Sequence, residues 1–138
     1  MNYFQLINAI LAQMDLPQIQ SFDDAHLPIH TKIKEYINRA NASILSYHEW
    51  GFANSDKNFI LNEYGELGKN FEYENDKSIL PEPYGSEMII YWVCIELNQE
   101  PNNPKYVHWL QRYNKAFSAL NAAGKKFCGN PVFKIERG

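Results

Sequence analysis

The chain has 138 residues, of which 45% are hydrophobic and 14% aromatic, and its formal net charge is -3. The length suits one domain with one sizeable core, and the composition excludes an intrinsically disordered protein. The first residues lack the basic region and the cleavage site of a signal peptide, and Asn8 and Gln13 interrupt their apolar run. We therefore expect neither a signal peptide nor a membrane span.

The two cysteines define no metal or disulfide pattern. Cys94 lies in the apolar run MIIYWVCIEL, where a cysteine is typically a small buried hydrophobe. Cys128 is the only other cysteine, and two such residues give neither a disulfide framework nor a zinc site. The expected compartment is the cytoplasm.

The charge is divided unevenly along the chain. Residues 125–138 carry four basic side chains and one acidic side chain, or +3. The remaining nine basic and fifteen acidic side chains give residues 1–124 a charge of -6. An acidic body repels nucleic acid, whereas a basic tail can pair with an acidic partner.

Two amphipathic helices are predicted in the first third of the chain. The first runs from Tyr3 to Met14, with Asn2 as its N-cap, and a loop follows from Leu16 to Leu27 with a turn at Asp23 and Asp24. The apolar positions of this first helix are Phe4, Leu6, Ile7, Ile10, Leu11 and Met14.

The second helix is predicted to begin at Pro28 and to run for about 20 residues, with Gly51 as its C-terminal stop. Trp50 and Phe52 flank this glycine, and we expect them to fold back onto the helix end. The apolar stripe of this helix consists of Ile29, Ile33, Ile37, Ala40, Ile44 and Leu45.

A β-hairpin is predicted after the second helix, with strands near residues 58–63 and 69–74. Phe59 and Leu61 alternate with polar residues, as do Phe71 and Tyr73, and two glycines lie between these runs. A two-stranded ribbon is marginal in water, so the hairpin must pack on its own helices or on a neighbouring subunit.

Two late helices complete the predicted fold. Ser86 is a candidate cap of the third helix, which is apolar almost all round and is therefore the expected core element. Asn103 and Pro104 are suited to cap and begin the fourth helix, which is expected to end at Gly124. The predicted buried stripe of the fourth helix is Val107, Leu110, Tyr113, Phe117 and Leu120.

The predicted fold is mainly α, a small bundle of about four helices with an inserted β-hairpin and an extended C-terminal tail. Residues 1–124 form the helical domain, with the hairpin near 58–74, and residues 125–138 form the tail. The tail is too apolar for a solvated linker. It either packs on its own domain or adds to a partner as an extended strand.

Catalytic and metal-binding chemistry has weak support in the sequence. Asp23, Asp24, His26 and His30 are the best candidates for a metal site, but Pro28 interrupts the helical spacing of the histidines and Asp-Asp is common in turns. Neither cysteine lies in an activating motif, and no glycine-rich phosphate loop occurs. We therefore assign no catalytic residue, no metal and no cofactor.

Three sequence features, taken in chain order, resemble the head-to-tail adaptor (connector) proteins of tailed bacteriophages. The first is the helix INRANASIL, which runs into His48, Glu49, Trp50, Gly51 and Phe52. The second is the hairpin followed by Ser-Ile-Leu-Pro at 78–81. The third is the pair of helices MIIYWVCIEL and VHWLQRYNKAFSAL, followed by the short tail.

The resemblance implies a non-enzymatic virion protein at the head-tail junction, assembled in the host cytoplasm. It implies a ring, usually of twelve copies, that binds the portal protein on one side and a downstream tail or nozzle protein on the other, with DNA passing through the lumen. The residues it assigns to portal docking are Phe127, Val132, Phe133, Lys134, Ile135 and Arg137. Those expected in subunit packing or at an interface are Trp50, Phe52, Phe59, Phe71 and Tyr73.

Two alternatives stay open at this point. One is a small helical regulatory or protein-binding module, monomeric or dimeric, that uses exposed aromatic residues to bind one partner. The other is a metal-dependent hydrolase built around Asp23, Asp24, His26 and His30.

Overall fold

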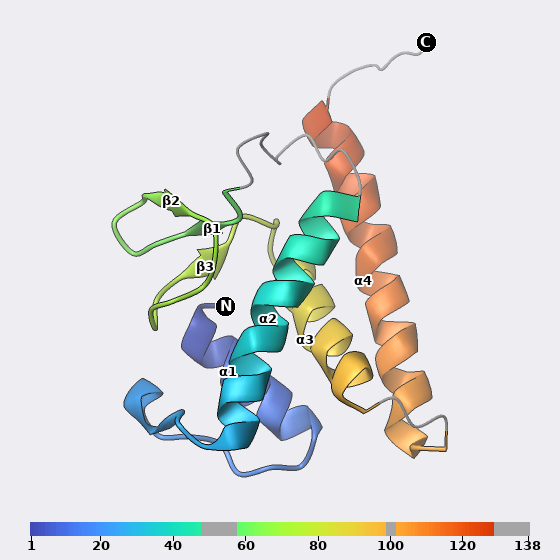
Figure 1. Cartoon of the computed structure of the whole chain (residues 1–138). Coiled ribbons are helices and arrows are strands. Elements are labelled where there is room, and N and C mark those ends of the chain that lie inside the picture. Colours follow the sequence, from blue (N-terminus) through green and yellow to red (C-terminus); the bar gives the residue numbers. More distant parts are fainter. Residues whose placement is uncertain (48–57, 99–101, 129–138) are drawn as a thin grey trace.

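The computed structural model describes residues 1–47, 58–98 and 102–128, and within these ranges the fold is mainly α, as predicted (Figure 1). The elements, in chain order, are α1 (Tyr3–Gln13), the 3₁₀ helix η1 (Phe22–Asp24), α2 (Pro28–Tyr47), β1 (Ile60–Leu61), β2 (Leu67–Gly68), β3 (Lys77–Ser78), α3 (Tyr84–Leu97) and α4 (Pro104–Cys128). The small sheet and α4 lie on opposite sides of α2 and α3 (Figure 1).

Helix α3 is the centre of the core, as its apolar sequence predicts. It packs against α1, α2 and α4, and Met88, Ile89 and Val93 are fully buried on it. Its first turn lies tightly against the preceding chain, because a Cβ atom at Gly85 would lie 2.4 Å from the Cβ atom of Leu80. Position 85 therefore requires a glycine for close packing.

The N-terminus of α1 is capped by its own sequence and by a distant loop. The Asn2 side chain accepts a hydrogen bond from the third helical amide at 2.9 Å, and the glutamine at that position accepts one from the Asn2 amide, which confirms the predicted cap. The first two helical amides, those of Tyr3 and Phe4, donate to the carbonyl oxygens of Asp76 and Glu74 at 2.8 and 3.3 Å. The loop before β3 therefore completes the helix end.

The C-terminus of α1 closes with a Schellman motif. Asp15 adopts a φ of 58°, its amide donates to Ala12, and the amide of Leu16 donates to Leu11 at 2.9 Å. The ammonium of Lys105, in the first turn of α4, lies 2.6 Å from the Asp15 carboxylate. This end of α1 is therefore held against the beginning of α4.

Helix α2 begins at Pro28 and has 20 residues described, which agrees with the predicted start and length. The predicted stripe is confirmed, with Ile29 half-buried and the other positions buried. The predicted stop at Gly51 lies outside the described residues, as do Trp50 and Phe52.

Helix α4 begins at Pro104, where the side-chain oxygen of Asn103 accepts a hydrogen bond from the amide of Lys105 at 2.9 Å, as predicted. The prediction that Gly124 ends this helix was wrong, because α4 continues to Cys128. A glycine inside a helix costs about 1 kcal/mol relative to alanine, and without a following proline it does not by itself stop the helix.

The buried face of α4 also differs from the predicted stripe. Val107 and Leu110 are 54% and 40% exposed, whereas Trp109 is 1% exposed. Burial of the large indole rotates the helix so that the positions on either side of it face outward. The main apolar side chains of α4 that face the bundle are Trp109, Tyr113, Ala116, Phe117 and Leu120.

The predicted hairpin exists, but its strands are shorter and a third strand joins it. β1 pairs antiparallel with β2 on one side and with β3 on the other, in the order β2-β1-β3. Residues 69–74 are not a strand, in contrast to the prediction. The carboxylate of Asp76 accepts hydrogen bonds from the amides of Glu72 and Tyr73, each at 2.8 Å, and closes this segment into a loop.

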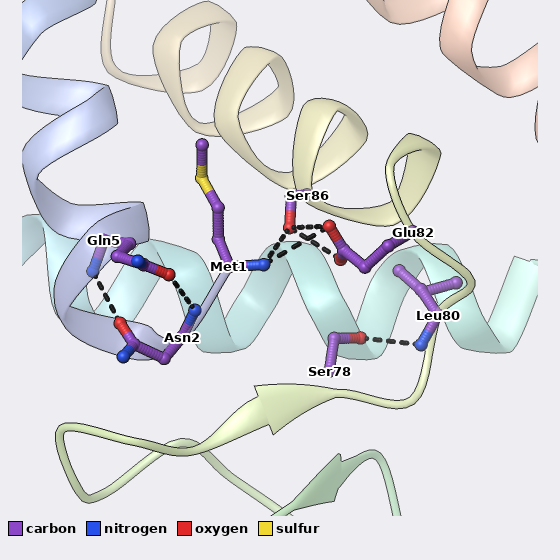
Figure 2. A network of polar contacts seen from close by, with 7 residues as sticks. All are labelled: Met1, Asn2, Gln5, Ser78, Leu80, Glu82 and Ser86. Atoms are coloured by element: carbon purple, nitrogen blue, oxygen red, sulfur yellow. Dashed lines mark hydrogen bonds and ion pairs between the residues drawn. The ribbon is translucent and has the colours of Figure 1, made fainter.

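Ser86 does not cap α3, because that helix begins two residues earlier at Tyr84. Figure 2 shows that its hydroxyl instead donates to the Glu82 carboxylate, at 2.7 Å. The amino group of Met1 lies 3.2 Å from the Ser86 hydroxyl and 3.3 Å from Glu82. Ser86 therefore joins the beginning of α3 to the N-terminal residue.

Candidate protein-interaction site

The three-stranded sheet has one buried face and one exposed face. Ile60 is 4% exposed and lies opposite Gly68 and Ser78 on the inner face. On the outer face Leu61 lies opposite Leu67 on β2 and opposite Lys77 on β3. Leu61 and Leu67 are 39% and 55% exposed, so this outer face presents two leucines side by side to solvent.

Two of the predicted interface residues belong to the inner side of the sheet region. Phe59 and Phe71 are buried, and the Phe71 ring lies 5.1 Å from the ring of Tyr3 on α1. These two rings therefore pack within the subunit. Tyr73 is 69% exposed and lies on the loop that follows Phe71.

Two asparagines of α2 hold the sheet region against the bundle. Asn38 donates to the carbonyl of Phe71 at 3.2 Å and accepts from its amide at 2.7 Å. One turn later Asn41, which is 1% exposed, donates to the carbonyl of Phe59 at 3.0 Å and accepts from the Ser78 hydroxyl. Neither contact could be predicted from the sequence, because no local pattern links an asparagine on a helix to a distant backbone group.

We call the exposed residues Leu61, Tyr64, Leu67 and Tyr73 the hairpin patch. Tyr64 lies in the turn of the hairpin, where Gly65 has a φ of 82° and the Asn62 side chain accepts hydrogen bonds from two turn amides. The hydrogen bond and the charge of Glu63 raise the pKa of Tyr64. Residues 61–76 carry five acidic and one basic side chain, so the patch lies in a segment with a charge of -4.

The remaining predicted site residues cannot be placed on this surface. Phe127 belongs to the last turn of α4. The other predicted tail residues, and the aromatic pair after α2, lie outside the described residues. They are Trp50, Phe52, Val132, Phe133, Lys134, Ile135 and Arg137.

The described part of the chain brings together no metal-ligand group of three or more His, Cys, Asp or Glu side chains. His30 is buried in the first turn of α2, where its Nδ1 accepts a hydrogen bond from the Leu27 amide. Asp23 and Asp24 belong to η1. In the same described ranges, no helix has the length and apolar character needed to cross a membrane.

Cys94 is fully buried on α3, as the sequence predicts. Burial raises the pKa of its thiol to about 12, and the nearby Lys105 lowers it only in part. This thiol is therefore protonated at neutral pH and is not an activated nucleophile.

No protein-family model matches the chain, and no curated protein or solved structure is significantly similar to it. The hairpin patch therefore stands on its own structural evidence as the candidate interaction site.

Proposed function

We propose that the protein is a structural, non-enzymatic virion component that forms a ring adaptor between the portal and the tail of a tailed phage. The sequence resemblance supplies this proposal, and the chain order of long helix, exposed hairpin and two packed late helices is compatible with it. In the proposed assembly, ring copies contact each other, the portal protein and a downstream tail protein, and DNA passes through the lumen.

The observation that supports an assembly role best is the two-sided hairpin. The sheet region is fixed to α2 by Asn38 and Asn41, whereas its outer face exposes Leu61 and Leu67. Tyr64, in the hairpin turn, and Tyr73, in the loop after Phe71, add two exposed aromatic side chains. A rigidly held, partly apolar surface loses little conformational entropy on binding, which favours a protein interface. We assign the hairpin patch to the contact with an adjacent subunit or the tail protein.

The charge distribution fits the remaining contacts of the proposed adaptor. The basic tail carries Phe127, Val132, Phe133 and Ile135 between its charges and is assigned to portal docking. The body of residues 1–124 has a charge of -6, which would limit attractive contacts with DNA that moves through a ring.

Co-assembly with a candidate portal protein tests the proposal. Purified full-length chain is mixed with the portal, and the products are imaged by electron microscopy. The matched variant carries Phe133→Asp and Ile135→Asp in the full chain, which leaves every described residue unchanged. We expect a ring on the portal with the natural sequence and none with the variant.

A ring that forms equally with both chains would contradict docking by the tail but retain the adaptor function. Failure of both chains to associate with the portal would contradict that portal pairing. The hairpin patch would then favour the alternative, a small protein-binding module with a single partner.

A further inference from the structure

A second surface feature, separate from the hairpin patch, is a groove of about 460 Å³ at the end of the bundle where α1 ends and α2 begins. We call it the α1–α2 groove. Its rim includes two exposed leucines, Leu16 at 38% and Leu27 at 51% exposure. The other lining side chains used below are Leu11, Ile19, Asp24, Ile29 and His30.

One wall of the groove is a fixed segment with unpaired backbone groups. The Asn8 side chain accepts a hydrogen bond from the Ile19 amide at 2.8 Å and donates one to the Ile19 carbonyl at 3.0 Å. The backbone groups of the neighbouring Gln18 and Gln20, which also line the groove, have no hydrogen-bond partner among the described residues. A fixed wall with free amides and carbonyls is suited to pair with an extended peptide.

His30 adds a buried donor to the same groove. The residue is 5% exposed, and its Nδ1 accepts the Leu27 amide proton, so the neutral ring carries its own proton on Nε2. That Nε2–H group has no acceptor among the described residues. A buried donor without a partner favours a ligand that brings an acceptor, such as a peptide carbonyl.

We propose that the α1–α2 groove binds residues 132–135 of a second copy of this chain as an extended strand. Phe133 and Ile135 are two positions apart, so in a strand they lie on one side and fit the apolar lining of the groove. The Asp24 carboxylate at the groove has no ion-pair partner among the described residues, and Arg137, on the same side of an extended strand as Phe133 and Ile135, supplies the opposite charge.

The strand must come from another copy because the chain's own tail is too short to reach the groove. The beginning of α4 contacts the end of α1 through Lys105 and Asp15, beside the groove, and α4 then extends 25 residues away, or about 37 Å. Ile135 follows Cys128 by seven residues, which span about 25 Å at most. The connection between α1 and α2, which lines the groove, and the last turn of α4 lie at opposite ends of the bundle (Figure 1).

A contact of this kind is head-to-tail, since each copy offers a groove at one end and a tail at the other. Such contacts propagate into rings or open chains of copies. The inference rests on the proposed function in one respect: a portal that binds the same tail would displace it from the groove, so this contact belongs to copies that are not yet on a portal.

Peptide binding tests the groove directly. The probe is a fluorescent peptide of residues 129–138. It is titrated with the chain that carries Phe133→Asp and Ile135→Asp, so that the tails of other copies do not compete with the peptide for the groove. We expect saturable binding that is lost when Leu27→Asp is added. The matched control is Val107→Asp on the exposed side of α4, because Val107 and Leu27 have similar exposure, 54% and 51%.

The variant His30→Asn tests whether the His30 side chain contributes to peptide binding. His30→Asn retains an oxygen that can accept the Leu27 amide proton but removes the Nε2–H donor. We expect peptide binding to weaken about tenfold, which corresponds to one hydrogen bond. Circular dichroism and thermal unfolding check each fold, and Leu16→Asp replaces Leu27→Asp if the latter does not fold.

Complementation tests the head-to-tail arrangement in the full chain. The Leu27→Asp chain has a tail and no working groove, and the Phe133→Asp/Ile135→Asp chain has a groove and no working tail. By sedimentation velocity, we expect the natural chain to self-associate with rising concentration, each variant to remain monomeric, and their equimolar mixture to form a dimer and nothing larger.

Three results would overturn the inference. They are a peptide that does not bind, binding or self-association that Val107→Asp abolishes and Leu27→Asp does not, and a variant mixture that stays monomeric. None of these results bears on whether the portal recruits the chain, so failure here is distinguishable from failure of the adaptor proposal.

Discussion

The helical bundle and the hairpin use their apolar residues in opposite ways. The bundle buries Trp109, Ile33 and Ile37 almost completely, whereas the hairpin and the loop after it expose Leu61, Leu67 and Tyr73. Phe71 and Tyr73 show the contrast over two positions, because one is 2% and the other 69% exposed. Residue type alone does not distinguish a core residue from an exposed one. In this segment, the loop that the Asp76 carboxylate closes leaves Phe71 buried and Tyr73 exposed.

The strongest way to break the bundle is to remove its largest fully buried side chain. We expect Trp109→Ala to lower the free energy of unfolding by about 3–5 kcal/mol, since it leaves a cavity and removes the hydrogen bond from the indole to Gln13. Val107→Ala, on the exposed side of the same helix, should change it by less than about 0.5 kcal/mol. Urea denaturation followed by circular dichroism measures both, and equal effects would contradict the described face of α4.

Removing an attachment of the sheet should have a smaller effect. We expect Asn41→Ala to cost about 1–3 kcal/mol, because the Phe59 carbonyl and the Ser78 hydroxyl lose their buried partner. The control is Asn114→Ala at an exposed position of α4, which should be nearly neutral. If both variants denature at the same urea concentration, Asn41 does not hold the sheet as described.

Alkaline pH should weaken the contact between α1 and the sheet region. Burial, and then the charge of Asp76, raise the pKa of Tyr3 well above its usual value of 10. The folded chain therefore holds the proton of the Tyr3 hydroxyl more tightly than the unfolded chain does. The contribution of this group to the free energy of unfolding is fully present below pH 10 and is lost as the pH rises above 10.

By pH 11 the loss from this one group should be about 1 kcal/mol. Urea denaturation at pH 8 and pH 11 measures it. The Tyr3→Phe chain should lose less stability over this interval than the natural chain, while Tyr73→Phe, at an exposed position, should behave like the natural chain. An unchanged pH dependence in Tyr3→Phe would exclude Tyr3 as the source.

Changes on the hairpin patch should have the smallest effect on the fold. We expect Leu67→Ser to alter the free energy of unfolding by less than about 0.5 kcal/mol, because Leu67 is 55% exposed. Leu61→Ser should cost about 1 kcal/mol, because Leu61 is only 39% exposed. In the proposed assembly they should instead reduce the number of rings seen by electron microscopy. A large loss of stability would mean that these leucines belong to the core.

The helices were predictable because their signals are local. Asn2 and the glutamine three residues later form a capping box, Pro28 and Pro104 begin helices, and the stripe of α2 follows the helical period. The burial of Trp109 was not predictable in this way, since Val107 and Leu110 fit a stripe equally well. Which side of α4 faces inward depends on the space that α3 and α1 leave for the indole ring of Trp109.

The sheet and the candidate sites depend on contacts between distant residues. β3 has two residues and no pattern of its own, and it forms because β1 lies beside it. The sequence drew attention to Asp24, His26 and His30 as possible metal ligands. The structure places all three on the α1–α2 groove, but His30 is oriented by the Leu27 amide rather than by a metal-ligand group among the described residues.

The carbonyl groups of Asp76 and Glu74 that cap α1 have a consequence for how the protein opens. Local fraying of a helix end normally exposes its first amides to solvent exchange without affecting the rest of the fold. Here the amides of Tyr3 and Phe4 can be released only when the loop before β3 moves away. In native-state hydrogen exchange, these N-terminal amides should therefore exchange together with those of the sheet, as one cooperative unit.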